Sequence, residues 1–337
     1  MTVDVLVVGT SIDPHISAVL TRLPPAVSVV RFDVDLFPRL NQLSIQYAND
    51  GLQVCLEQGG QEFDISRPRV AWFRRLGKVG ISDKIPDKYR QFCIGEAEQA
   101  LEGMLSLIQP GVWVNEYWAT RRAANKPFQY SVARAVGLAA PDTLVTNSPD
   151  RAEQWLSAAP LAAVKSIHSP VVIHGESLGE RAFAFTHQLT AEDRQNLAEV
   201  ATTACQFQPY LHKAYELRVT TIGGHHFAVR IDAPELTGRD DWRPAAKECI
   251  YQSWELPYEV AAGLTRLMDA LGLGYAASDF IVTPTGETIF LESNPHGAWL
   301  WLEENLPGLG IADHFGRYVE RVVNDSPNEA GNVILST

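Results

Sequence analysis

Three oxygen-bearing side chains near the end of the chain could share a metal ion. Asp279 lies in one apolar run, and Glu292 and Asn294 lie in the next. The Pro-Thr-Gly between the two runs is typical of a β-hairpin turn, and a two-residue Thr285-Gly286 loop would place Asp279 directly opposite Glu292. Because strand side chains alternate between faces, Asn294 would then share the face of Glu292.

Two directly opposed carboxylates destabilise a sheet unless a positive charge neutralises them. Carboxylate and amide oxygens suit Mg²⁺, which commonly takes its remaining ligands from water and nucleotide phosphates. The pattern therefore indicates a site for Mg²⁺ together with a nucleotide. The alternative is a hairpin whose carboxylates face water.

Two lysines are placed where they could reach phosphate groups. Lys126 directly precedes Pro127, which is typical of the first turn of a helix, and Lys165 ends the apolar run that starts at Leu161. A lysine at a strand end beside a polar loop can contact a phosphate. Either lysine could instead lie along the surface with only its ammonium group in water.

A connector and three arginines complete the polar candidates. The connector contains Gln208, Tyr210 and Leu211, which could offer backbone groups to an adenine edge or be an ordinary link. Arg218 and Arg230 flank the turn signal Gly223-Gly224. A three-residue loop there would place them opposite one another, and a two-residue loop would place them on opposite faces, so the sequence leaves both arrangements open. Arg243 follows in a charged, irregular stretch, and each of the three could be a surface arginine.

The N-terminal part of the chain alternates between strand and helix patterns. We expect strands at Val3–Val8, Val27–Phe32 and Val70–Phe73, a helix within Lys88–Ile108, and a hairpin around Gly59-Gly60. Alternating strands and helices predict a mainly parallel sheet. Arg74 and Arg75 directly follow one strand, where they could bind an acidic peptide or a phosphate, or form a structural ion pair with the neighbouring domain.

The pattern changes in the second half. Helices are expected at Pro127–Ala135, Ala191–Cys205 and Tyr258–Leu271, and two hairpins contribute antiparallel strands. The predicted fold class is therefore α/β, with α+β character in the C-terminal half. We expect three domains, over residues 1–114, 115–206 and 207–337.

Composition narrows the class of protein. The chain has 337 residues and a formal net charge of −12, which argues against general nucleic-acid binding. Its four cysteines are scattered without a C-x-x-C pair, which is typical of reduced thiols in a cytoplasmic protein. We see no signal peptide and no apolar run long enough to span a membrane, so no membrane partner is expected.

Taken in order, these segments resemble an ATP-grasp ligase. The stretch LESNPHGAWLWLEE (Leu291–Glu304) resembles the acidic E-x-N-P motif of that superfamily. Three further stretches are similar to the ligases that macrocyclise ribosomal peptides such as microviridins. They are AWFRRLG (Ala71–Gly77), NKPFQYSVARAVGLAAPDTLVTNSP (Asn125–Pro149) and DDWRP (Asp240–Pro244). The similarity extends over about residues 68–305.

The resemblance implies an ATP-grasp fold with an N-terminal α/β domain, a small central domain and a C-terminal antiparallel-sheet domain. It implies ATP and one or two Mg²⁺ ions as cofactors, with Lys126 and Lys165 on the phosphates. By the same analogy Gln208, Tyr210 and Leu211 form the adenine hinge, and the metal ligands are Asp279, Glu292 and Asn294. The segment Ser166–Arg181 would close over the triphosphate, although it has only two glycines.

The implied reaction activates a carboxylate as an acyl phosphate, which a hydroxyl or amine then attacks. Arg218, Arg230 and Arg243 are the candidates for stabilising the transferred group, with Arg243 favoured by its motif. Arg74, Arg75 and His296 are candidate substrate contacts, and His296 departs from the small residue more common after E-x-N-P.

The predicted partner is a precursor peptide with acidic and Ser, Thr or Lys core residues, and a homodimer is one option. Two other functions remain open. One is an ATP-grasp ligase that adds a free amino acid to a peptide or protein end. The other is a nucleotide-regulated binding module that keeps the fold without turnover.

Overall fold

A computed structural model describes residues 3–49, 51–168, 171–173, 181–183, 186–235, 237–238 and 240–325. The chain divides into two compact units. Unit 1 comprises the described residues of Met1–Ala119, Leu273–Tyr275 and Gly310–Thr337, and unit 2 those of Thr120–Gly272 and Ala276–Leu309. The predicted segment Ser166–Arg181, which was expected to close over a triphosphate, lies largely outside the described residues.

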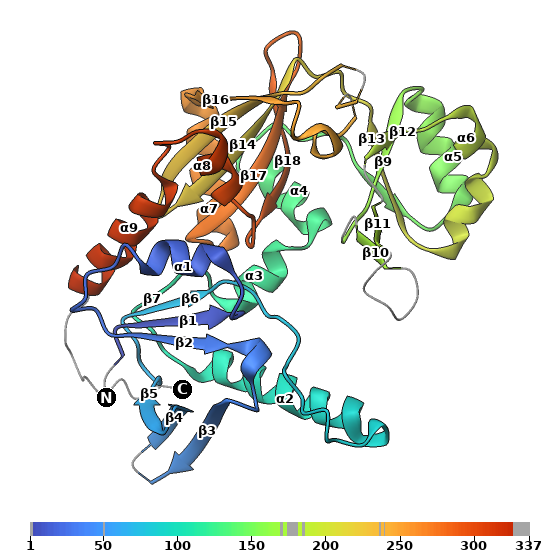
Figure 1. Cartoon of the computed structure of the whole chain (residues 1–337). Coiled ribbons are helices and arrows are strands. Elements are labelled where there is room, and N and C mark those ends of the chain that lie inside the picture. Colours follow the sequence, from blue (N-terminus) through green and yellow to red (C-terminus); the bar gives the residue numbers. More distant parts are fainter. Residues whose placement is uncertain are drawn as a thin grey trace. The chain divides into compact units, whose positions relative to one another are not determined.

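Unit 1 is built on a four-stranded parallel sheet in the order β2-β1-β6-β7 (Figure 1). The strands are β1 (Val5–Gly9), β2 (Val29–Asp33), β6 (Val70–Phe73) and β7 (Val112–Trp113). Every residue of β1 and β6 is buried, which is typical of parallel strands covered on both faces. This sheet confirms the predicted α/β character of the N-terminal part.

Three helices cover the two faces of this sheet (Figure 1). They are α1 (Pro14–Leu20), α2 (Asp87–Leu107) and α9 (Ile311–Asp325). Leu101 and Met104 of α2 belong to the same apolar cluster as Phe73, on one face. On the other face Trp72 packs against Phe315 of α9, with ring centroids 4.7 Å apart.

A separate antiparallel sheet in unit 1 contains the predicted Gly59-Gly60 hairpin. Its strands are β3 (Asn41–Ala48), β4 (Gly51–Gln58) and β5 (Gln61–Asp64). Both turn glycines have positive φ, which only glycine adopts readily. No strand was expected at β3, because it is an edge strand of this sheet and most of its side chains are exposed, so it lacks a clear apolar alternation. Two short helical elements remain. The 3₁₀ helix η1 (Val34–Leu36) lies between β2 and β3, and α3 (Tyr117–Ala123) follows β7.

Unit 2 contains a small antiparallel sheet in the order β12-β9-β13-β8. Its strands are β8 (Leu144–Thr146), β9 (Ala162–Lys165), β12 (His187–Gln188) and β13 (Cys205–Pro209). Two further short strands, β10 (Val171–Ile173) and β11 (Arg181–Phe183), pair with one another. Helix α5 (Pro149–Ala158) begins at Ser148, whose hydroxyl accepts from the Arg151 amide at 3.4 Å.

The helix predicted at Ala191–Cys205 is not continuous. The structure has α6 (Ala191–Gln195), followed by the 3₁₀ helix η2 (Leu197–Thr202) and then strand β13. Thr190 and Asp193 form a capping box that starts α6. Asn196 and Thr202 have low helix propensity, which accounts for the break and the early end.

The second sheet of unit 2 is antiparallel and has five strands in the order β16-β15-β14-β17-β18 (Figure 1). They are β14 (Tyr215–Ile222), β15 (His225–Asp232), β16 (Ile250–Trp254), β17 (Tyr275–Val282) and β18 (Thr288–Asn294). Helices α4 (Lys126–Ala135), α7 (Tyr258–Leu271) and α8 (Leu300–Asn305) and the 3₁₀ helix η3 (Arg243–Ala245) accompany it. This antiparallel part confirms the predicted change of fold character after the first half.

The hairpin of β17 and β18 differs from the prediction in its loop but agrees in its key pair. Val282 pairs with Thr288, and the Thr283 amide donates to the Glu287 carbonyl at 2.9 Å, so three residues, 284–286, remain in the loop. The two-residue Thr285-Gly286 loop was therefore wrong. A bulge between Asp279 and Phe280 shifts the register by one residue. Asp279 therefore still pairs with Glu292.

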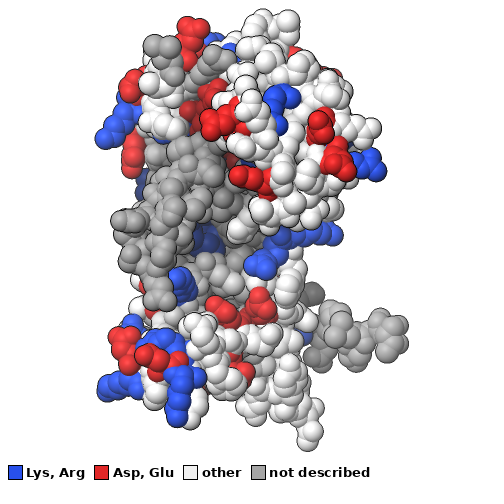
Figure 2. Space-filling model, turned by 90° about the vertical axis from the view of Figure 1, so that its right-hand side faces the viewer, with Lys and Arg blue, Asp and Glu red and all other residues white. Residues whose placement is uncertain are grey.

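Charge distribution and helix hydropathy complete the description. On the face shown in Figure 2, acidic and basic side chains are interspersed rather than separated by sign. In the described part of the chain, no helix combines the length and apolar character that a bilayer crossing requires.

Candidate active site

A cleft of about 390 Å³ lies within unit 2. Its walls come from both sheets of the unit, from α4 and from the segment 240–243. The sequence-predicted residues that line it are Lys126, Lys165, Gln208, Tyr210, Leu211, Arg243, Asp279, Glu292 and Asn294. Residues separated by more than 160 positions thus meet in one cavity.

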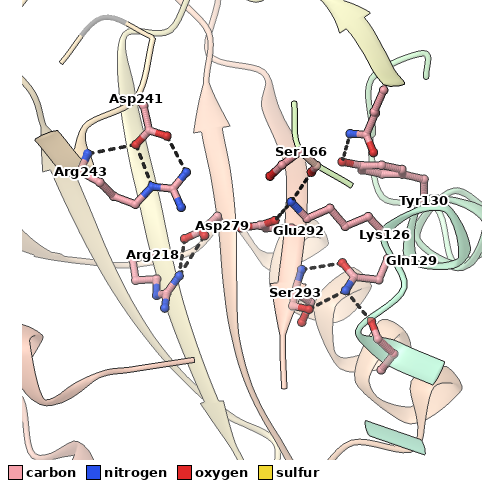
Figure 3. A network of polar contacts seen from close by, with 12 residues as sticks. Lys126, Gln129, Tyr130, Ser166, Arg218, Asp241, Arg243, Asp279, Glu292 and Ser293 are labelled. Atoms are coloured by element: carbon pink, nitrogen blue, oxygen red, sulfur yellow. Dashed lines mark hydrogen bonds and ion pairs between the residues drawn. The ribbon is translucent and has the colours of Figure 1, made fainter. Parts of the chain in front are cut away.

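Two opposed carboxylates lie in this cleft, and each has its own cation (Figure 3). Arg218 Nη1 donates to both carboxylate oxygens of Asp279, at 2.8 and 2.9 Å. Lys126 Nζ lies 2.9 Å from Glu292 Oε2. The two cations offset the repulsion that a pair of opposed carboxylates would otherwise create.

The two carboxylates differ in their ionisation. Burial and the nearby charge of Glu292 raise the pKa of Asp279, and Arg218 only partly opposes this. Burial alone would raise the pKa of Glu292 too, but Lys126, Arg243 and Lys165 outweigh it and lower that pKa. The arrangement keeps negative charge on Glu292, the residue with more cations around it.

Lys126 is held by the start of α4. The side chain of Asn125 caps the helix by accepting from the Phe128 amide at 3.0 Å, and Pro127 occupies the first turn. Lys126 Nζ also donates to the Ser166 carbonyl at 3.0 Å, directly after β9. The side chain therefore connects α4 to the strand end that carries Lys165.

Lys165 lies beside Lys126 and Glu292 in the cleft wall. Burial lowers the pKa of Lys165, while Glu292 favours its charged form. A partly desolvated ammonium group at a strand end is suited to an anionic ligand, because it gains more from that ligand than a solvated one does.

The connector after β13 lines the other end of the cleft. The side-chain Nε2 of Gln208 donates to Thr143 Oγ1 at 2.9 Å, and the backbone amide of Tyr210 donates to the Leu161 carbonyl at 2.9 Å. The Tyr210 hydroxyl donates to Asp240 at 2.7 Å. These contacts fix the connector against the segment that leads to Arg243.

Arg218 and Arg230 lie on opposite faces of the five-stranded sheet. The Gly223-Gly224 loop has two residues, so Arg230 pairs with Leu217 rather than with Arg218. Arg230 donates to Asp232 at 2.7 Å and stacks on the Tyr215 ring at 3.9 Å. The structure therefore does not bring Arg230 to the cleft.

Arg243 is held by its neighbour Asp241 (Figure 3). Its Nε donates to Asp241 Oδ1 at 2.8 Å and its Nη2 to Oδ2 at 2.5 Å. Burial alone would lower the pKa of Arg243, but the hydrogen bonds and charge of Asp241 raise it above its usual range. The Arg243 side chain is 44% exposed and lines the cleft, so it is both oriented and accessible.

The three candidate substrate contacts are placed differently. In unit 1 the Arg74 side chain is almost fully buried and lies 3.3 Å from Asp13, whereas Arg75 is 43% exposed and lies 3.0 Å from the same carboxylate. Arg74 thus forms an ion pair inside unit 1, with Asp13, rather than the expected pair with a neighbouring domain. In unit 2 the His296 amide donates to Asn294 Oδ1 at 2.8 Å, which orients that amide oxygen.

Several residues of the cleft were not predicted from the sequence. Glu216 and Lys213 form a buried pair at 2.5 Å, and burial raises the pKa of Glu216 to about 7. Gln129 is buried between α4 and β18. Its position three residues after Lys126, on the same side of a helix, was the available signal.

A divalent cation in this cleft would need an amide oxygen and outside ligands in addition to carboxylates. No group of three or more His, Cys, Asp or Glu side chains with metal-binding geometry occurs in the described residues. Among the residues that line the cleft, the opposed carboxylates of Asp279 and Glu292 and the amide oxygen of Asn294 are all oxygen donors. This set suits Mg²⁺, which completes its coordination with water and phosphate oxygens.

Comparisons with known proteins begin with a family model that matches the N-terminal part of the chain. Residues 4–121 match the family described as the MvdD pre-ATP grasp domain. No curated protein matches the chain.

Solved structures resemble the chain over almost its whole length. Macrocyclase MdnC from Microcystis aeruginosa MRC, bound with precursor peptide MdnA, is 29% identical with a TM-score of 0.82, over 96% of this chain and 100% of that one. Macrocyclase MdnB from the same source is 27% identical with a TM-score of 0.75, over 95% and 99%. A ribosomal-peptide-associated ATP-grasp ligase from Chryseobacterium gregarium, with ADP and leader and core peptides, is 24% identical with a TM-score of 0.87, over 99% and 100%.

The fold and the cleft together define an ATP-grasp enzyme, and the chain is an ATP-dependent ligase of that class. Within the class it resembles the microviridin-type macrocyclases of ribosomal peptides, as the sequence motifs indicated.

Proposed function

We propose that the chain uses ATP and Mg²⁺ to join side chains of a ribosomally made peptide by ester or amide bonds. The observation that carries the proposal is the opposed pair Asp279 and Glu292 in one cleft with Lys126 and Lys165. Joining a carboxylate to a triphosphate brings two anions together, and this cleft supplies the cations and oxygen ligands that such an encounter needs.

The nucleotide would lie along the cleft. Lys126 and Lys165 are at the end suited to phosphates, and Gln208, Tyr210 and Leu211 are suited to the adenine edge. The Tyr210 hydroxyl donates to Asp240, and Arg243 lies three residues after Asp240 in the chain. The segment 240–243 would therefore extend along the cleft from the adenine end toward the carboxylates.

Asp279, Glu292 and Asn294 would hold one or two Mg²⁺ ions, which supply charge neutralisation at the phosphates. Arg218 would act on Asp279 by fixing both of its oxygens. Arg243, held in place by Asp241, is accessible to stabilise the transferred phosphoryl group. We assign no role in the reaction to Arg230.

The proposed reaction has two steps. An oxygen of the peptide carboxylate attacks the γ-phosphorus of ATP, the bond to ADP breaks, and an acyl phosphate forms. A hydroxyl or amine of the same peptide then attacks the acyl carbon, loses a proton, and expels phosphate. Each bond formed removes one water from the peptide overall.

The peptide partner is proposed from the relatives. MdnC and the Chryseobacterium ligase are described in complex with precursor or leader and core peptides. We extend this to a peptide rich in acidic and Ser, Thr or Lys residues. Arg75, half-exposed and only partly neutralised by a carboxylate it shares with Arg74, is our candidate contact for its carboxylates, and His296 is a candidate near the metal ligands.

Two structural proposals accompany this function. The four-stranded and five-stranded sheets of unit 2 would form the cores of a central domain over residues 115–206 and a C-terminal domain over residues 207–337, with the cleft between these two sheets. The described residues from Gly310 onward belong to unit 1. A homodimer is proposed from the resemblance alone, and light scattering of the purified chain tests it.

The function is tested by looking beside the gene for a small open reading frame rich in Thr, Ser, Lys, Asp and Glu, and by incubating the chain with that peptide, ATP and Mg²⁺. The expected result is a loss of about 18 Da per bond, together with ADP. A mass gain with free amino acids would instead favour the amino-acid ligase, and the absence of ADP with every acidic peptide would favour a binding module.

A further inference from the structure

The side chain of Gln129 connects helix α4, which carries Lys126, to strand β18, which carries Glu292 (Figure 3). Its Nε2 donates to the Ser293 carbonyl at 2.7 Å, and the Ser293 amide donates to its Oε1 at 2.8 Å. Nε2 also donates to the Ala123 carbonyl at 2.5 Å, just before α4. Both Gln129 and Ser293 are buried, at 2% and 0% exposure.

The contact exists because β18 is the edge strand of its sheet. The outward backbone groups of an edge strand have no neighbouring strand, and buried backbone groups need partners. A primary amide presents a donor and an acceptor side by side, so the Gln129 side chain pairs with Ser293 as a strand would. Further along the same edge, the Phe290 amide donates to the Ala139 carbonyl at 2.7 Å.

The neighbours of this contact are the groups that the proposed reaction needs. Lys126 lies three residues before Gln129 on the same side of α4, and Glu292 directly precedes Ser293. Ser293 Oγ lies 3.0 Å from Ser278 Oγ, next to Asp279. The hydrogen-bonded chain from α4 through β18 to β17 thus passes directly beside both carboxylates.

We propose that Gln129 is a positioning residue that sets the distance from Lys126 to Glu292, and so places nucleotide phosphates over the metal carboxylates. This inference rests on the proposed function. Without Gln129 the start of α4 loses its fixed register on β18, and Lys126 can move from its 2.9 Å contact with Glu292. A displacement of about 1 Å in such a site can cost about 10²-fold in rate.

The test compares Gln129→Ala and Gln129→Met with Arg266→Ala. Arg266 donates twice to the Val136 carbonyl at the far end of α4, at 3.1 and 2.9 Å, so its loss removes two bonds from the same helix away from β18. Gln129→Met keeps nearly the volume of the side chain and removes its hydrogen bonds to Ser293, so it serves as the second variant if the alanine variant fails to fold. Magnesium-dependent binding of a non-hydrolysable ATP analogue is measured by calorimetry, beside thermal unfolding.

We expect at least about tenfold weaker nucleotide binding in both Gln129→Ala and Gln129→Met, and no loss in Arg266→Ala. Because Gln129 acts through Lys126, adding Gln129→Ala to Lys126→Ala should weaken binding no further. Additive losses in the double variant, or unchanged binding in both Gln129 variants, would overturn the inference. If the unaltered chain binds no nucleotide, the proposed function itself fails.

Discussion

Asp279 faces Glu292 across the β17–β18 hairpin because a bulge compensates for a loop one residue longer than the sequence indicated. Leu291, the extra residue on the bulged strand, lines the same cleft as the two carboxylates. Bulges are common beside functional sites because they redirect single side chains without ending a strand. Here the bulge brings both carboxylates to one level of the sheet.

We first predict that Asp279→Asn and Glu292→Gln each lower ligase turnover by about 10²–10³-fold, because under the proposed function each removes one charge that would hold metal at the phosphates. ADP release under saturating ATP measures this. Glu287→Gln is the matched control, since Glu287 is an exposed carboxylate in the turn of the same hairpin. Equal effects of all three substitutions would contradict the role of the pair.

The two arginines of the β14–β15 hairpin give the second prediction. Arg218→Ala frees the buried Asp279 from its cation, so we expect turnover to fall by about 10²-fold or more. Arg230→Ala removes a charge of the same sign on the opposite face, where Asp232 already holds it, and turnover should stay within about twofold.

Steady-state turnover with thermal unfolding of both variants makes this comparison. Arg218→Lys should recover only part of the activity, because a lysine ammonium does not reproduce the fixed geometry of the guanidinium. A loss of turnover in Arg230→Ala equal to that in Arg218→Ala would show that the sheet's integrity, rather than the cleft-side charge, is being measured.

The same arginines show how far sequence reasoning extends. Alternation along a strand states that Arg218 and Arg230 share a face only if the loop has an odd number of residues, and two consecutive glycines are compatible with either loop. The structure decides for two residues. Local patterns thus located the strands, while the face of each arginine depended on a turn that they do not specify.

Two other misses have different origins. β3 alternates only weakly because it is an edge strand with mostly exposed side chains, and the continuous helix expected after Ala191 is broken at Asn196. The contact of Arg218 with Asp279 joins β14 to β17, which are 61 positions apart at these residues, so no local spacing reveals it. Lys126 and Lys165 were found because helix starts and strand ends leave local signals.

The third prediction concerns Arg243. Arg243→Ala should abolish product while leaving the fold intact, because the side chain is accessible in the cleft and its stabilisation of transferred charge is lost. Asp241→Asn should give a smaller loss, since it releases the guanidinium but keeps its charge. Product mass spectrometry with circular dichroism measures both, and near-normal turnover of Arg243→Ala would remove it from the reaction.

The last prediction concerns the stability of unit 1 and its dependence on pH. Burial alone would raise the pKa of Asp13, but the hydrogen bonds from His15 and the charges of Arg74 and Arg75 hold it well below its usual range. A carboxyl whose folded pKa is depressed stabilises the fold above its unfolded pKa, near 3.9, and loses that contribution as the pH falls toward the folded value.

Asp13→Asn should therefore cost about 3–5 kcal/mol at pH 7, because it leaves the buried Arg74 beside a neutral amide. The difference from the unaltered chain should shrink as the pH falls from about 4 toward 2, since protonation then removes the same charge from Asp13 itself. Urea unfolding at pH 7, 4 and 3 measures this, with the exposed Asp87→Asn as control within about 0.5 kcal/mol. A difference that stays constant over this range would show that the Asp13 carboxylate charge is not what stabilises unit 1.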